Sequence, residues 1–423
     1  MASTSAPELA QTILDECLQY GTWPSTILDA LIERALDEDD QFVARAATRA
    51  LFSIIIERLA DLFEPALCEL YSKLFAHVIS RAVPEFSSEE LLIRYGRVRQ
   101  VRSFQGGEVN RAFVLSRVTL GADIAVTSMA LAACKLRFPD AEICFVGPQK
   151  NAELFVADPR ITPIPLTYGR TSLLRERLLA AMELRTLVDE MGSIVVDPDS
   201  RLTQLGLIPV CDDARYYFFE SRAFGGEWSG SLSQLTGEWL RGVFDTQDVQ
   251  PYVAPPEQQR IADVTVSWGV GENADKRVGE EFETAGIATL LHHGLKVLLD
   301  CGAGDEETNR ALALGNRLGR PDLLFLHRGS YASFASHIAQ SRLYIGYDSA
   351  GQHVASAVGV PLISVFAGFP CPRMLSRWSP SGQTAQVIAV DAQDPSPAIA
   401  RALAAIATAA LEVAEGLSAA PKD

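Results

Sequence analysis

The segment from Asp348 to Pro361 places a carboxylate, a hydroxyl, an imidazole and several small residues between two expected strands, 343–346 and 361–365. A strand, turn and short helix of this kind directs free backbone N–H groups toward the carboxyl edge of a parallel sheet, where a diphosphate can be received. The alternative is structural, since two of these residues could cap the helix and the imidazole could be a satisfied polar group on its face. The residues of interest are Asp348, Ser349, Ala350, Gly351 and His353.

A second carboxylate follows another expected strand, 112–115. Asp123 stands at the start of an expected helix, 124–137, after the small residues Gly121 and Ala122. A carboxylate at the tip of a strand is suited to taking a proton from a hydroxyl in a cleft. Asp123 could instead be the N-cap of the helix.

A third group of residues follows the expected strand 263–267. Gly269 and Gly271 form a small-residue loop, and a lone Gly-x-Gly after a strand is weak evidence of a ligand site. Lys276 and Arg277 strengthen the indication, because a cation there can neutralise charge on a departing diphosphate. A solvated loop remains the alternative.

The order of residues from Asp348 to Pro361 closely resembles the D-[ST]-G-x-x-H-x-x-x-A-x-G-x-P signature of glycosyltransferase family 9, the bacterial ADP-heptose heptosyltransferases. Ala350 stands where the family has glycine. The segment 135–142 (KLRFPDAE) resembles the family's [RK]-x-[FY]-P stretch, and Lys276-Arg277 resembles the end of its small-residue loop, although Val278-Gly279 replaces the usual Trp-Pro.

The resemblance implies roles for several residues. Asp123 falls on the family's proposed catalytic base, and Lys276 or Arg277 on the cation that meets the phosphates. By alignment, Glu306 would contact the ribose or sugar hydroxyls of the donor, and Gly329 lies where similar enzymes hold the base through backbone groups. Arg201 is expected on the acceptor side of the cleft.

Family membership would imply an α/β protein of the GT-B type, with two Rossmann-like domains facing a cleft. The expected activity is inverting transfer of a sugar, heptose by analogy, from a nucleotide diphosphate to a hydroxyl of a glycan, a lipopolysaccharide core or a protein. No cofactor or metal is expected. The altered positions Ala122, Ala350 and Val278 leave open a non-catalytic nucleotide-sugar-binding or scaffold protein, and an epimerase of similar fold is a further alternative.

Two other polar groups have simpler interpretations. Asp197 and Asp199 form a D-x-D triplet that could hold a divalent metal, but Asp199 or Ser200 is more naturally the N-cap of a following helix. Arg373 and Arg377 could form a basic loop over the cleft, although surface arginines are the favoured reading.

The spacing of apolar residues, helical in one part of the chain and alternating between strand and helix in the rest, divides the chain into domains. Residues 1–102 are expected to form a helical N-terminal domain, 108–248 a Rossmann-like acceptor domain, 257–390 a Rossmann-like donor domain, and 391–423 a C-terminal helix and tail. Strands are expected at 112–115, 142–146 and 194–196 in the first unit and at 263–267, 296–299, 323–326, 343–346 and 361–365 in the second. Their alternation with helices predicts parallel sheets, because parallel strands need long crossovers. The Pro-rich stretch 251–256 is the expected linker.

Bulk properties limit the function classes. The chain has 423 residues and a formal net charge of −16, without a strongly basic face, which argues against nucleic acid as a partner. No secretion signal and no apolar run long enough to cross a bilayer are evident, so a soluble cytoplasmic protein is expected. The helical region lies outside the usual heptosyltransferase pattern, which makes a protein acceptor or oligomer formation conceivable.

Overall fold

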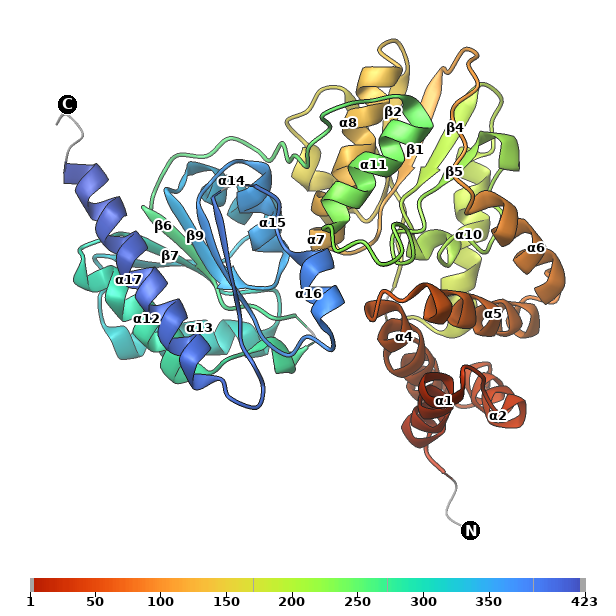
Figure 1. Cartoon of the computed structure of the whole chain (residues 1–423), viewed down its shortest axis with the longest axis horizontal. Helices are drawn as coiled ribbons and strands as arrows, with labels where there is room; N and C mark the ends of the chain where they lie inside the picture. Colours follow the sequence, from red (N-terminus) through yellow and green to blue (C-terminus); the bar gives the residue numbers. More distant parts are fainter. Residues whose placement is uncertain (1–3, 170, 272, 383, 419–423) are drawn as a thin grey trace.

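A computed structural model describes residues 4–169, 171–271, 273–382 and 384–418. The chain forms two parallel sheets with helices on both faces, preceded by a group of helices (Figure 1). Glu272, within the third motif, and residues 419–423 of the expected tail lie outside the described residues.

The first sheet has five strands in the order β3-β2-β1-β4-β5. The expected strands 112–115 and 142–146 are confirmed as β1 and β2, while the edge strands β3 and β5 were not anticipated. The strands are β1 (Arg111–Leu115), β2 (Glu142–Gly147), β3 (Ile161–Pro165), β4 (Ser193–Asp197) and β5 (Tyr216–Phe218). The helices that follow them include α7 (Leu120–Ala122), α8 (Ser128–Arg137), α9 (Gln149–Ala152), α10 (Leu174–Val188) and α11 (Leu232–Phe244).

The second sheet has six strands in the order β11-β10-β9-β6-β7-β8, which is the doubly wound order of dinucleotide-binding folds. Five of its strands are those expected, and the edge strand β11 was missed. They are β6 (Val264–Ser267), β7 (Val297–Asp300), β8 (Leu324–His327), β9 (Leu343–Tyr347), β10 (Leu362–Phe366) and β11 (Ala385–Ala389). Its helices are α12 (Glu280–His292), α13 (Asp305–Leu318), α14 (Tyr331–Gln340), α15 (Ala350–Ala357), α16 (Pro372–Trp378) and α17 (Ser396–Ser418).

The N-terminal region is helical, as expected, but its apolar core is not separate. Buried residues such as Leu74 of α5 and Leu51 belong to the same cluster as Leu178 of α10 and Phe113 of β1. These helices therefore share the core of the first sheet, and they pack against α10 and the edge strand β5 at one end of the sheet (Figure 1). They are α1 (Ala6–Tyr20), α2 (Ser25–Ala35), α3 (Gln41–Arg49), α4 (Glu57–Asp61), α5 (Pro65–Ala82) and α6 (Ser88–Val98), with a π-helical segment, Ala50–Ile56, between α3 and α4.

Helix α17 lies along the outer side of the second sheet (Figure 1). It buries Ala402, Ile406 and Ala410 and contacts α12 and the strands β9, β10 and β11. By length and composition alone this helix could cross a membrane, with a mean hydropathy of 1.5 over 18 residues of which 22% are buried. The sequence analysis did not anticipate this.

Because the helical region and the first sheet share a core, we expect Leu74→Ala to destabilise both together. Leu74 is fully buried, and truncation of a buried leucine costs about 2–5 kcal/mol. Urea unfolding followed by far-UV circular dichroism and by tryptophan fluorescence should show a lower midpoint in both signals. A shift confined to one signal would show that the helices unfold independently of the sheet.

Candidate functional site

The two central strands of the second sheet, β6 and β9, are neighbours at the point where the strand order reverses. Ligands of such sheets bind beyond the carboxyl ends of the strands at this point. Lys276, after β6, donates from its Nζ to Asp348 Oδ2 at 2.6 Å and to the Asp348 carbonyl oxygen at 3.2 Å. The structure thus brings together two residues predicted for the donor site from segments more than 70 positions apart.

Asp348 is held from its other side by a residue that the sequence analysis missed. Gln352 is fully buried; its Nε2 donates to Asp348 Oδ1 at 2.8 Å, and its Oε1 accepts from Ser364 Oγ at 2.5 Å. The signal in the sequence was the spacing of four residues, which lets a side chain in the first turn of α15 reach back to the residue before its N-cap.

The turn between β9 and α15 depends on small residues. Ser349 occupies the N-cap position of α15 but its hydroxyl makes no capping hydrogen bond, so the capping alternative is not supported. A Cβ at Gly351 would lie 2.0 Å from Tyr344 Oη, and only glycine fits there. Ala350 lies beside Gly121 of α7, where a Cβ on the glycine would be 3.5 Å from Ala350 Cα. The two sheet domains therefore meet closely at the N-terminus of α15.

His353 lies on the same helix, facing the other domain. Burial lowers the pKa of His353 to about 4, so its imidazole is neutral at neutral pH. Its ring lies 5.9 Å from that of Trp378, and its Nε2 is 3.4 Å from Gln352 Nε2. A neutral imidazole here can accept or donate one hydrogen bond but adds no charge to the site.

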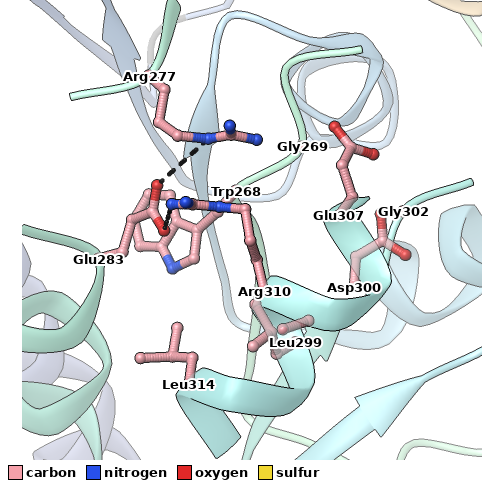
Figure 2. A pocket seen from close by; sticks show the side chains of 11 residues that line it. Trp268, Gly269, Arg277, Glu283, Leu299, Asp300, Gly302, Glu307, Arg310 and Leu314 are labelled. Carbon is pink, nitrogen blue, oxygen red and sulfur yellow. Dashed lines mark hydrogen bonds and ion pairs between the residues drawn. The ribbon is translucent and has the colours of Figure 1, made fainter. Parts of the chain in front are cut away.

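The small-residue loop after β6 has its amides already occupied by a carboxylate. Glu307 Oε1 accepts from the backbone N–H groups of Val270 at 2.9 Å and Gly271 at 3.1 Å, beside Gly269 (Figure 2). The predicted contact residue, Glu306, points elsewhere. Its side chain is 80% exposed and pairs with Arg277 at 3.2 Å. The shift by one position follows from the helix, because successive residues of α13 face directions about 100° apart.

Arg277 is directed into a small pocket within the second domain. Figure 2 shows Arg277 and Arg310 converging on Glu283, with distances of 3.8 and 2.9 Å. Glu283 also accepts from Tyr347 Oη at 3.0 Å, and burial raises the pKa of Glu283. The neighbouring cations thus have different partners: Lys276 pairs with Asp348 at the sheet edge, whereas Arg277 pairs with Glu283 and Glu306.

Gly329 follows β8, the outer strand of the second sheet, two strands away from β6. A Cβ at Gly329 would lie 3.1 Å from His327 Nε2. The role of Gly329 beside a nucleobase stays a prediction.

Asp123 does not have the environment predicted for it. The helix begins at Leu120, with Thr119 as its N-cap, and a π-helical segment runs from Asp123 to Thr127. Asp123 is therefore inside the helix, and neither a residue at a strand tip nor an N-cap. Its carboxylate is fully buried.

Four groups donate hydrogen bonds to Asp123. They are Ser116 Oγ (2.6 Å), the Arg117 backbone N–H (2.7 Å), Thr127 Oγ1 (2.7 Å) and Asn151 Nδ2 (2.5 Å). Burial raises the pKa of Asp123, and these hydrogen bonds oppose the rise. With all lone-pair positions used and no exposed surface, Asp123 fixes the turn after β1 and does not face the cleft.

The carboxyl edge of the first sheet instead presents arginines. Asp199 is fully buried and pairs with Arg222 at 2.6 Å and with Arg117 at 3.7 Å. Burial lowers the pKa of Arg117 to about 10. Arg201 lies at the same edge, 3.8 Å from Glu57 of α4. Its contact with an acceptor stays a prediction.

The D-x-D carboxylates have separate partners. Asp197 accepts from Thr203 Oγ1, Tyr216 Oη and the Ser200 backbone N–H, each at 2.5–2.7 Å. Ser200 caps the following turn by accepting from the Leu202 N–H, as the structural interpretation predicted.

Of the two arginines of α16, Arg377 is buried, contrary to the favoured interpretation, and Arg373 is partly exposed. Arg377 is 1% exposed and donates to the carbonyl oxygens of Trp228 at 2.5 Å and Gly230 at 2.6 Å in the first domain. Arg373 Nη1 donates to the Phe63 carbonyl oxygen at 3.0 Å. Helix α16 therefore connects the second domain to both the first domain and the helical region.

A family model of known proteins matches the second domain. Residues 280–401 match the family model of glycosyltransferase family 9 (heptosyltransferase), which confirms the resemblance seen in the sequence. This range includes the Asp348 segment, whereas Lys276 and Asp123 lie outside it. No curated protein matches the chain.

Solved structures extend the likeness of fold to both sheets. Escherichia coli heptosyltransferase WaaC with ADP is 14% identical, with a TM-score of 0.53, covering 70% of this chain and 99% of its own. A glycosyl transferase family 9 protein from Veillonella parvula is 15% identical, with a TM-score of 0.54, covering 74% of this chain and 100% of its own. Escherichia coli ADP-heptose lps heptosyltransferase II is 15% identical, with a TM-score of 0.52, covering 73% of this chain and 100% of its own. The chain therefore has a GT-B-like fold, and part of it has no counterpart in these structures.

Burial of His353 predicts a loss of stability in acid. Because folding lowers its pKa from 6.5 to about 4, the unfolded chain binds the proton more readily between these values. This contribution to stability is present above pH 6.5 and is lost as the pH falls toward 4. We expect the melting temperature of the wild type to fall more steeply than that of His353→Gln between pH 7 and 4.5. Parallel curves for the two proteins would contradict this assignment.

Proposed function

We propose, from the family 9 match of residues 280–401 and the two facing sheets, that this chain is a glycosyltransferase that moves a sugar from a nucleotide diphosphate donor to an acceptor hydroxyl. The second domain would hold the donor, and the first domain with the helical region would hold the acceptor. By analogy with relatives whose descriptions name ADP and ADP-heptose, an ADP-linked heptose is the first donor to test.

One observation carries this proposal: a cation and a helix N-terminus meet at the switch point of the second sheet. The ammonium group of Lys276 lies against Asp348, directly before α15. A diphosphate placed there would receive the backbone N–H groups of the turn and the charge of Lys276. These same groups would stabilise the negative charge that develops as the bond to the sugar breaks.

The close contact of α7 with α15 supports transfer across the domain boundary. Gly121 packs against the first turn of α15, so an acceptor at the edge of the first sheet would lie near a donor at the edge of the second. Inversion at the anomeric carbon by direct attack of the acceptor hydroxyl is the corresponding mechanism. We place the reaction in the cytoplasm as part of this proposal.

A second function is favoured by one specific observation. The burial of Asp123 removes the family's proposed base from the cleft, as expected of a protein that binds a nucleotide sugar without catalysis. Turnover distinguishes the two. Purified protein incubated with a panel of ADP-, UDP- and GDP-sugars should release the nucleoside diphosphate from at least one if it is a transferase. Calorimetric binding of a donor without any release would favour the non-catalytic function.

Removal of Lys276 tests the donor site. We expect Lys276→Ala to weaken binding of ADP by about 10- to 100-fold, since hydrogen bonds to charged groups contribute about 1.5–3 kcal/mol, and calorimetry measures this directly. Lys296→Ala serves as the matched control. It removes the same charge from an exposed position just before β7, at the end of the sheet away from the proposed donor site. Equal affinities for the two variants would exclude Lys276 from the phosphate site.

A further inference from the structure

A corner of the helical region reaches the boundary between the two sheet domains. Phe63, between α4 and α5, is 1% exposed, and its ring packs edge-on to Trp378 of α16 at 6.4 Å. The carbonyl oxygen of Phe63 accepts from Arg373. The backbone of Phe63 has φ of 55°, a left-handed conformation that is unfavourable for a bulky side chain. Contacts with the second domain hold this corner in place, and strain of this type is common at functional sites.

The corner closes one side of a polar cavity of about 180 Å³. The cavity lies over the carboxyl edge of the first sheet, at the reversal point between β1 and β4 where ligands of such folds bind. All three parts of the chain contribute to its walls. Its lining includes Asp61 from α4, Arg117, Thr119, Asp199 and Arg201 from the first domain, and Trp378 from the second.

The carboxylates around this cavity differ in whether their oxygens already have hydrogen-bond or ion-pair partners. Asp123 receives four hydrogen bonds and is fully enclosed, and Asp199 is paired with two arginines. Glu57 pairs with Arg201. Among the described residues, none donates a hydrogen bond to Asp61, which lines the cavity and is partly exposed. Asp61 is therefore the carboxylate whose lone pairs are available to a molecule in the cavity.

The electrostatic surroundings connect Asp61 to the donor site. Burial raises the pKa of Asp61, while the charges of Arg222, Arg201 and Lys276 lower it and that of Glu57 raises it, with a net increase. Trp378, which lines the cavity, also packs against His353 of α15 with their rings 5.9 Å apart, so the cavity borders the proposed phosphate site. A carboxylate with a raised pKa takes up a proton more readily than one with an ordinary value.

We propose that Asp61, contributed by the helical region, is the catalytic base of the sugar transfer. This inference rests on the proposed function. In the step, Asp61 Oδ takes the proton of the acceptor hydroxyl while the oxygen of that hydroxyl forms a bond to the anomeric carbon. The bond from that carbon to the phosphate oxygen breaks, and the nucleoside diphosphate leaves with the electron pair beside Lys276. Asp61 then releases the proton to solvent.

This assignment explains why the helical region shares a core with the first sheet. A base carried on a separate domain needs a fixed position relative to the acceptor, because small displacements greatly reduce the rate. The shared core and the contacts of Phe63 with Trp378 and Arg373 provide that position from two sides.

The test compares Asp61→Asn with Glu64→Gln, an equivalent change at an exposed position three residues along the same corner. Using the nucleotide sugar that the wild type turns over, with water as the acceptor, we expect Asp61→Asn to lower kcat for nucleoside diphosphate release by about a hundredfold or more. The Kd for ADP and the melting temperature should stay near the wild-type values. Asp61→Glu, which keeps a carboxylate, should recover part of the rate, and Glu64→Gln should match the wild type.

Two outcomes would overturn the assignment. One is a kcat for folded Asp61→Asn within about threefold of the wild type, well below the loss expected for a missing general base. The other is a loss of rate in Asp61→Asn that is matched by an equal loss of ADP affinity, which would indicate a binding role. If the wild type releases nucleoside diphosphate from no donor, the proposed function fails, and this result is distinct from the first two.

Discussion

The position of Lys276 relative to Asp348 is the constraint on which the proposed donor site depends. The two side chains are mostly buried, and burying charges is costly unless they are paired and hydrogen-bonded. Gln352 satisfies the second oxygen of Asp348 and is itself held by Ser364. The ammonium group is therefore fixed where the positive end of α15 points, and both can act on the same anion. The strand order of the sheet makes this possible, since it places β6 and β9 side by side.

The facing edge of the first sheet is organised by a different carboxylate. Asp123 accepts hydrogen bonds from the turn after β1, its own helix and the region after β2, so it fixes the turn that carries Arg117. Its enclosure leaves the cavity above this turn lined by arginines and by Asp61. The polar groups that line this cavity are thus supplied partly by the helical region, which a two-domain description of the fold would leave out.

Three contacts hold the parts together around this cavity. The helices share a core with the first sheet, the corner at Phe63 packs against Trp378, and Arg377 donates to carbonyl groups of the first domain. Buried hydrogen bonds from a charged donor are strong relative to neutral ones. They make the relative placement of the parts specific as well as stable.

The two sheets, most of their strands, the Asp348 segment and the family resemblance of the second domain could all be predicted from the sequence. Period and order of residues are local properties, and central strands such as β1 and β9 are continuous apolar runs. It missed β3, β5 and β11, because edge strands are short or partly exposed and β3 contains two prolines. Which charged groups face the cleft could not be predicted, because it depends on contacts between segments far apart in the chain. Asp123 is buried because the helix begins earlier than its apolar pattern indicates. Glu307, and not Glu306, accepts hydrogen bonds from the loop amides. Asp61 lines the cavity because of contacts between distant segments, which no local pattern encodes.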